Sequence, residues 1–173
     1  MPSLSALNSA DRAAFTAALG HLFEHSPWVA EETWPQRPFA SAEALHAALC
    51  ATMRGAAKDR QLALIRAHPD LAGRLAQQKK LTAESTHEQA SAGLDQLTDA
   101  ELAEFTSNNN RYKAKFGFPF IICARLTAKA AILAAMQTRG GNSPDPEFAT
   151  ALGEIEKIAR LRLHDVLGTT KPH

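Results

Sequence analysis

The sequence contains only two cysteines, Cys50 and Cys123, and they lie far apart. Neither belongs to a CxxC pair or to a spacing typical of a zinc site, and two residues cannot form the disulfide framework of a small secreted domain. We therefore expect reduced thiols and a cytoplasmic location. The first fifteen residues also lack the basic start and apolar core of a secretory signal, which agrees with that expectation.

Long apolar runs and an excess of one charge are missing as well. No stretch approaches the ~20 apolar residues of a membrane-spanning helix. Nineteen basic residues face eighteen acidic ones, which gives a formal charge of +1. Because phosphate binding needs clustered Lys and Arg, and only Lys79 and Lys80 come close to a cluster, we expect neither nucleic acid nor a membrane as a partner.

Aromatic residues make up only 6% of the chain, strand signals are scarce, and apolar residues recur at intervals of three and four. The 45% hydrophobic and 21% charged residues are typical of a globular protein, and 173 residues suit one domain. The sequence therefore predicts an all-α fold, a single compact domain over residues 1–173 with about eight helices and short loops.

The expected helices are bounded by caps and by prolines and glycines. Asn8 or Ser9 can cap the first one, Ser41 the third, and Thr98 with Glu101 matches a capping box. The run FGFPFIICARL is continuously apolar around a proline, and periodicity does not decide its conformation. The predicted helices cover residues 10–23, 27–34, 41–54, 69–80, 85–92, 98–115, 127–138 and about 146–167, with one more helical segment after Gly55.

His68 ends an apolar run and precedes Pro69, the residue type that is best tolerated at the first position of a helix. The positive end of a helix that begins there would favour a neutral imidazole. A neutral imidazole in a half-apolar setting can accept or deliver a proton. His68 is therefore a candidate catalytic residue, and the alternative is a core histidine satisfied by one backbone hydrogen bond.

Ser85 and Glu88 have the spacing of a capping box, which would account for both residues without any function. The start of a helix also offers free N–H groups to an anion, and Glu88 and Gln89 can hold an imidazole or a ureido group. The spacing alone leaves both interpretations open.

Arg162 lies on the apolar stripe of the last expected helix, four residues after Ile158 and four before Val166. Arg160, by contrast, is spaced to pair with Glu156 on the exposed side. Because an isolated buried charge is very costly, Arg162 needs an anionic partner. That partner is either a carboxylate of the protein or the carboxylate of a substrate.

Two further patterns suggest other chemistry. His21, Glu24 and His25 fit the H-x-x-E-H pattern of zinc peptidases, in which two histidines one helical turn apart bind the metal. The Ser-Pro dipeptide that follows would end that helix at once, and no third ligand is evident. Cys123 could act as a nucleophile, but no histidine is near it in sequence, and its apolar surroundings should raise its pKa.

Five stretches in order resemble the decarboxylases of urate degradation, the 2-oxo-4-hydroxy-4-carboxy-5-ureidoimidazoline (OHCU) decarboxylase family. They are FEHSPWVAEETW, AHPDLAGRLA, ESTHEQASAGLD, NNNRYKAKFGFPFIICARL and EIEKIARLRLHDVL, spread over nearly the whole chain. The resemblance implies an enzyme that converts OHCU, its small-molecule substrate, to S-allantoin and carbon dioxide, with no cofactor and no metal. It also implies a homodimer, and it accounts for the HLFEHSPW segment without zinc.

The resemblance assigns roles residue by residue. His68 is the catalytic histidine, and Glu88 is expected to pair with it or with the substrate. Loss of carbon dioxide from a carbon beside a ring C=N bond can push electrons into that bond, so the reaction needs no cofactor to accept them. The protons must still be moved, and His68 would serve as the proton carrier. We expect Arg162 to hold a carbonyl or the ureido end, because clamping the leaving carboxylate would stabilise the ground state. The implied substrate-binding residues are Pro69, Ser85, Glu88, Gln89, Phe120, Ile121, Ile122, Cys123, Ala124 and Arg162.

The main alternative is a helical module that binds a purine-derived ureido metabolite without converting it. That alternative predicts tight ligand binding and no product. The zinc hydrolase alternative instead predicts bound metal and a loss of activity with a chelator.

Overall fold

The computed structural model describes residues 1–73, 76 and 78–169, and over these residues the protein is all-α. Nine α-helices and three short 3-10 helices are assigned in this part of the chain, and no strand, so the expected fold class is confirmed. Contacts divide the chain into two units, Met1–Ala67 with Glu156–His173 (unit 1) and His68–Ile155 (unit 2). A single-domain organisation over residues 1–173 stays a prediction. None of the helices in the described part is long and apolar enough to cross a membrane.

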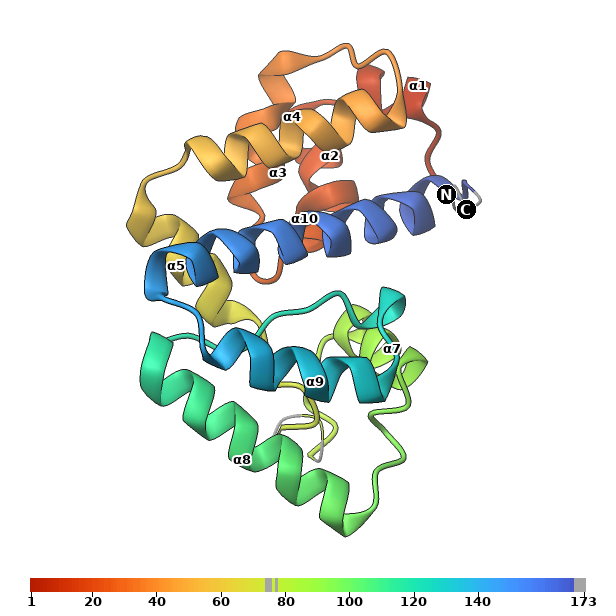
Figure 1. Cartoon of the computed structure of the whole chain (residues 1–173). Helices are drawn as coiled ribbons and strands as arrows, with labels where there is room; N and C mark the ends of the chain where they lie inside the picture. The colour runs from red at the N-terminus through yellow and green to blue at the C-terminus, as the bar shows by residue number, and fades with distance from the viewer. Residues whose placement is uncertain (74–75, 77, 170–173) are drawn as a thin grey trace. The chain divides into compact units, whose positions relative to one another are not determined.

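Unit 1 is built from short helices whose apolar faces meet. Along α4, Leu45, Leu49 and Met53 follow at intervals of four, so they share one face, and all three are fully buried. Helix α3 packs against both α2 and α4 (Figure 1). Ser41 caps α4 as expected, because its side chain accepts a hydrogen bond from the backbone of Ala44. The helices are α1 (Leu4–Ser9), α2 (Arg12–Leu19), α3 (Trp28–Thr33), α4 (Ala42–Gly55) and α5 (Lys58–Ala67), with 3-10 turns at Gly20–Leu22 and Trp34–Gln36.

The expected first helix over residues 10–23 is confirmed in part, because α2 covers Arg12–Leu19 and a 3-10 turn covers Gly20–Leu22, while α1 precedes them as a separate helix. Asp11 interrupts the helix and caps α2, accepting a hydrogen bond from Ala14 N at 2.8 Å. Asn8, one of the two expected caps, contacts a distant residue. Its Nδ2 donates to the carbonyl of Phe39 at 2.9 Å, and its Oδ1 accepts from the N–H of Phe39 at 2.8 Å.

Unit 2 contains α7 (Ala83–Ser91), α8 (Asp99–Phe116), the 3-10 helix η3 (Ala124–Leu126) and α9 (Lys129–Gly140). The expected capping box at Thr98 and Glu101 is confirmed with both of its hydrogen bonds, and Gly117 ends α8 in the left-handed conformation, with φ of 75°. Helix α8 packs against α9, and α7 packs against η3.

Helix α10 (Pro144–Leu167) begins two residues before the expected start at residue 146, and its residues belong to unit 2 up to Ile155 and to unit 1 from Glu156. The pair expected between Glu156 and Arg160 is wrong. Glu156 instead binds Arg54 of α4 at 2.5 Å, because the helix turns that carboxylate toward a neighbouring element of unit 1.

Candidate functional site

His68 follows α5 directly and is buried, with 8% of its surface exposed. The helix expected to begin at Pro69 does not form over residues 69–73, which adopt turns and irregular structure. Ala72 has a φ of 49°, a left-handed conformation that is incompatible with a continuing α-helix. Residues 74, 75 and 77 of that expected helix lie outside the described residues. No helix begins at Pro69, so the expectation that the positive end of such a helix acts on the His68 imidazole is wrong.

Polar side chains from α7 and α8 hold the loop that follows His68. Gln89 Oε1 accepts from the backbone N–H of Ala72 at 2.9 Å, and Gln89 Nε2 donates to the carbonyl of Asp70 at 3.3 Å. From α8, Asn109 Nδ2 donates to the carbonyl of Leu71 at 2.8 Å. These side chains satisfy backbone groups that a helix would have paired internally, which is why a buried irregular loop is tolerated here.

Helix α7 carries a buried polar face. Ser85, Glu88 and Gln89 lie at i, i+3 and i+4, so they share one side of the helix, and all three are buried. The cap of α7 is Thr82, whose Oγ1 accepts from the backbone N–H of Ser85 at 3.2 Å. The interpretation of Ser85 and Glu88 as a capping box is therefore wrong, and their burial needs another explanation.

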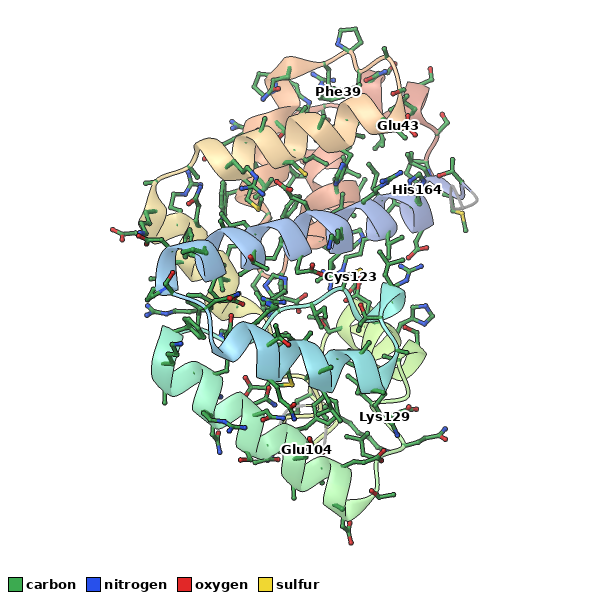
Figure 2. All side chains as sticks on the ribbon, viewed as in Figure 1. Phe39, Glu43, Glu104, Cys123, Lys129 and His164 are labelled. Atoms are coloured by element: carbon green, nitrogen blue, oxygen red, sulfur yellow. The ribbon has the colours of Figure 1, made fainter. Side chains whose placement is uncertain are left out.

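Most of the apolar run before α9, residues 117–123 between α8 and η3, is neither helix nor strand. All but one of the five residues at its end are buried, namely Phe120, Ile121, Cys123 and Ala124, whereas Ile122 is half-buried. Cys123, which directly precedes η3, is labelled in Figure 2. The run follows α8 directly, and η3 at its end contacts α7.

The electrostatics of Cys123 relate this segment to α7. Burial, followed by the charges of Glu154 and Glu88, raises the pKa of Cys123 to about 11. The thiol form thus predominates at neutral pH, which confirms the expected direction of the pKa shift and argues against a thiolate nucleophile. The influence of Glu88 on this thiol indicates that the α7 carboxylate lies near the apolar segment.

Charged side chains satisfy the backbone of the apolar segment. Glu154 of α10 accepts from the N–H of Cys123 at 2.8 Å, and Arg139 Nη1 donates to the carbonyl of Ile121 at 2.8 Å. The Arg139 guanidinium also lies over the ring of Phe120, 4.3 Å from its centroid. An apolar stretch without secondary structure is thus held in one conformation by polar side chains from α9 and α10.

Arg139 is itself fixed by Glu147, a fully buried acid in the first turn of α10. Glu147 accepts from Arg139 Nε at 2.7 Å, from the Tyr112 hydroxyl at 2.5 Å and from Asn142 Nδ2 at 2.9 Å. Burial, together with the hydrogen bond to Glu147, raises the pKa of Tyr112. Sequence reasoning missed this network. The available signal was only general, since an irregular buried segment must find partners for its backbone.

Arg162 is buried, as expected, and its partner inside the protein is an acid of unit 1. Arg162 Nη2 lies 3.0 Å from Glu24 Oε2, and Nη1 donates to the carbonyl of His21 at 3.2 Å. Of the two partners that the sequence left open, the structure therefore supplies the carboxylate of the protein. A further contact of Arg162 with substrate stays a prediction.

The same ion pair removes the basis for a zinc site at residues 21–25. The 3-10 helix ends at Leu22, and His25 has a φ of 46°, so the two histidines are not one α-helical turn apart. Glu24 binds Arg162 rather than activating a metal-bound water. Within the described ranges, no group of three or more His, Cys, Asp or Glu side chains could hold a metal ion.

Residues 8–164 match the family model for OHCU decarboxylase. The chain is 43% identical over 171 residues to the 2-oxo-4-hydroxy-4-carboxy-5-ureidoimidazoline decarboxylase of Halalkalicoccus jeotgali, covering 96% of this chain and 95% of that protein. It is 40% identical over 162 residues to the protein of the same name from Mus musculus, covering 94% and 91% of the two chains.

A solved structure, the crystal structure of (S)-allantoin synthase, has the same fold. It superposes with a TM-score of 0.76 at 33% identity, and the match covers 96% of this chain but only 54% of that one. Fold, family model and relatives agree on one class, the all-α decarboxylases. The chain belongs to the OHCU decarboxylase family.

Proposed function

We propose that this protein converts OHCU to S-allantoin and carbon dioxide in urate degradation, as a carboxy-lyase. The observation that carries the proposal is the buried polar face of α7, in a chain whose relatives bear this enzyme's name. Ser85 and Glu88 do not cap the helix, and a role in binding or catalysis accounts for their place on its buried face.

The reaction needs little beyond orientation and proton transfer. The bond from the ring carbon to the carboxylate breaks and carbon dioxide leaves, the electron pair forms a double bond to the adjacent imine carbon, and the C=N electrons move onto the ring nitrogen, which takes up a proton. The hydroxyl on the same ring carbon loses its proton and becomes a carbonyl, and the former imine carbon takes up a proton on one face. Because the substrate accepts the electrons, the chain has to bind, exclude water and move protons.

His68 is the proton carrier in this proposal, since an imidazole can accept and deliver a proton at neutral pH. Glu88 orients it or binds the substrate directly, and Ser85 and Gln89 bind polar groups of the substrate. Pro69 and the segment from Phe120 to Ala124 line the ring. An apolar wall excludes water and so favours loss of charge from the carboxylate.

Arg162 binds a carbonyl or the ureido end of the substrate in this proposal. Its planar guanidinium suits such polar acceptors, and its ion pair with Glu24 holds it in place. We further propose, from the family resemblance, that the protein is a homodimer and acts in the cytoplasm. Light scattering behind size exclusion gives the mass to compare with 18.7 kDa per chain.

The test generates OHCU in the cuvette from urate with urate oxidase and hydroxyisourate hydrolase, and follows circular dichroism as this protein is added. Wild type, His68→Asn and His87→Asn are compared with and without EDTA. His87 is the matched control, because it is an exposed histidine on α7. We expect rapid formation of one allantoin enantiomer that is insensitive to EDTA, abolished in His68→Asn and retained in His87→Asn.

Other outcomes identify the alternatives. Optical activity that rises no faster than the background, together with tight binding of allantoin, would support the non-converting binding module. Loss of activity with EDTA would support a metal enzyme. Equal activity of His68→Asn and wild type would leave the decarboxylase intact and overturn the assignment of His68.

A further inference from the structure

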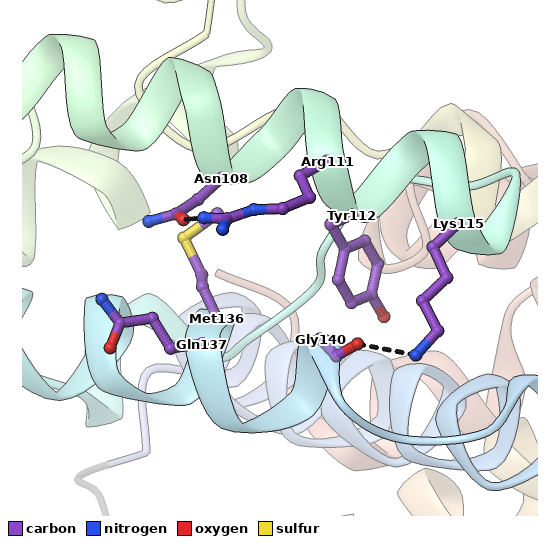
Figure 3. A pocket seen from close by; sticks show the side chains of 7 residues that line it. All are labelled: Asn108, Arg111, Tyr112, Lys115, Met136, Gln137 and Gly140. Carbon is purple, nitrogen blue, oxygen red and sulfur yellow. Dashed lines mark hydrogen bonds between the residues drawn. The ribbon is translucent and has the colours of Figure 1, made fainter.

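Helices α8 and α9 of unit 2 line a partly open pocket of about 350 Å³ that takes no part in the proposed reaction. That volume lies in the range of small-molecule sites. Figure 3 shows α8 contributing a row of side chains along one wall and α9 the opposite wall. The lining residues are Asn108, Arg111, Tyr112, Lys115, Met136, Gln137 and Gly140.

The charged groups of this pocket have one sign. Arg111 and Lys115 are four residues apart on α8, so both cations lie on the same face of the helix. Among the residues that the structure describes, none that lines the pocket is acidic. The Tyr112 hydroxyl donates to the Glu147 carboxylate, but the charge of Glu147 is balanced by Arg139, whose Nη2 lies 2.5 Å from Glu147 Oε1. The pocket therefore presents positive charge that no lining group offsets.

A buried donor in the pocket is unsatisfied. Asn108 is only 5% exposed, and in the described part of the chain its Nδ2 has no hydrogen-bond partner. The orientation of the amide is determined by Arg111, whose Nη2 donates to Asn108 Oδ1, because a guanidinium cannot accept a hydrogen bond from the amide nitrogen. In Figure 3 the amide nitrogen points away from Arg111, toward the end of the pocket where Gln137 lies.

Lys115 gives the pocket a defined width. Its Nζ donates to the carbonyl of Gly140 at 2.7 Å and so links α8 to the end of α9 (Figure 3). An ammonium group has three N–H donors, so this contact leaves others for a ligand. Arg111 likewise keeps N–H groups beyond the one that Asn108 accepts. The side chains thus supply several donors around one space, and a buried donor without a partner costs folding free energy that a ligand would recover.

We propose that this pocket binds a small oxyanion, a carboxylate or phosphate group carried by a metabolite. A carboxylate or phosphate accepts hydrogen bonds from the Arg111 fork at one end of the pocket, a second polar group of the same molecule accepts from the Lys115 ammonium at the other end, and the Asn108 amide supplies a further donor. Met136 and the ring of Tyr112 offer apolar surface to the remainder of the molecule. The site is independent of the proposed decarboxylation, because it uses none of the residues assigned to that reaction.

Titration of the full chain with inorganic phosphate and, separately, with succinate tests the proposal, followed by ¹H–¹⁵N NMR of the Asn108 side-chain amide and the Arg111 Nε. We expect saturable shifts of both signals with at least one of the two probes. Arg111→Gln and Lys115→Gln should each weaken that binding by about tenfold or more, because each removes a charge-assisted hydrogen bond.

Lys80→Gln is the control, because it removes one exposed positive charge of unit 2 outside the pocket. This variant should keep the binding constant of the wild type. The probe that binds identifies the source of the oxyanion. Shifts that do not saturate with either probe, or equal weakening in Lys80→Gln, would overturn the proposal.

Discussion

The buried ion pair between Arg162 and Glu24 offers the sharpest test of the forces in unit 1. Its nitrogen and oxygen are 3.0 Å apart, with side-chain exposures of 3% and 2%. Two unit charges at that distance attract by about 5.5 kcal/mol at an effective dielectric constant of 20. The desolvation of both groups offsets much of this attraction, so the pair adds little net stability, but removal of one partner exposes the full cost of the other.

We predict that Glu24→Gln lowers the free energy of unfolding by about 3 kcal/mol. Breaking a buried pair typically costs ~3–5 kcal/mol, and the lower end applies because glutamine keeps one oxygen that can accept a hydrogen bond. Urea unfolding followed by far-ultraviolet circular dichroism measures the loss. Arg162→Met should be destabilising as well, whereas the double variant should recover much of the stability, because neither charge is then left in the core.

The exposed pair between Arg60 and Glu32 is the matched control. It is also in unit 1 and is shorter, at 2.8 Å, but its side chains are 43% and 45% exposed. Glu32→Gln should cost no more than about 1 kcal/mol, since water already solvates both charges. If Glu24→Gln costs no more than Glu32→Gln, or if the double variant is as unstable as the sum of its single variants, burial does not govern the strength of these pairs.

Three further outcomes are expected in unit 2. Tyr112→Phe should lower the free energy of unfolding by about 1.5–3 kcal/mol, because it removes a hydrogen bond to the buried Glu147 carboxylate; an unchanged urea midpoint would contradict this. Gln89→Leu should reduce kcat more than it raises KM, because it releases the loop after His68, and a change in KM alone would point to substrate binding. Cys123 should resist iodoacetamide at pH 8 until the chain unfolds. Because folding raises its pKa from 9.0 to about 11, its contribution to stability is complete below pH 9 and is lost as the pH rises toward 11, which urea titrations across that range would detect.

Local signals predicted local structure well. The capping box at Thr98 and Glu101 closes within three residues, so the sequence contains both of its halves. Where a polar side chain binds a distant backbone, the same reasoning fails. Asn8 is an acceptable cap by composition, but its amide pairs with Phe39, 31 residues away. Ser85 and Glu88 matched a capping box as well, and Thr82, one turn earlier, caps the helix instead.

The burial of Arg162 illustrates what pattern alone can establish about the candidate site. Its position on an apolar stripe predicted a buried charge with an anionic partner, and the structure confirms both. The identity of that partner was not predictable, because Glu24 is 138 residues away in the sequence and lies in a segment whose only evident pattern was that of a metal site. The position of an arginine on the apolar face of a helix thus indicates that it is buried and needs an anionic partner. Only the tertiary structure determines which acidic residue that partner is.

The residues that shape the apolar segment were harder still to predict, because they resemble ordinary surface charges in sequence. Arg139 and Glu154 bind the backbone at Ile121 and Cys123, and an irregular buried segment requires such partners because its own N–H and C=O groups cannot pair with each other. A search for chemistry would single out His68 and overlook these residues. A buried apolar segment that is neither helix nor strand implies that polar side chains from other elements bind its backbone. Those side chains then determine the geometry of the groups that the segment contacts.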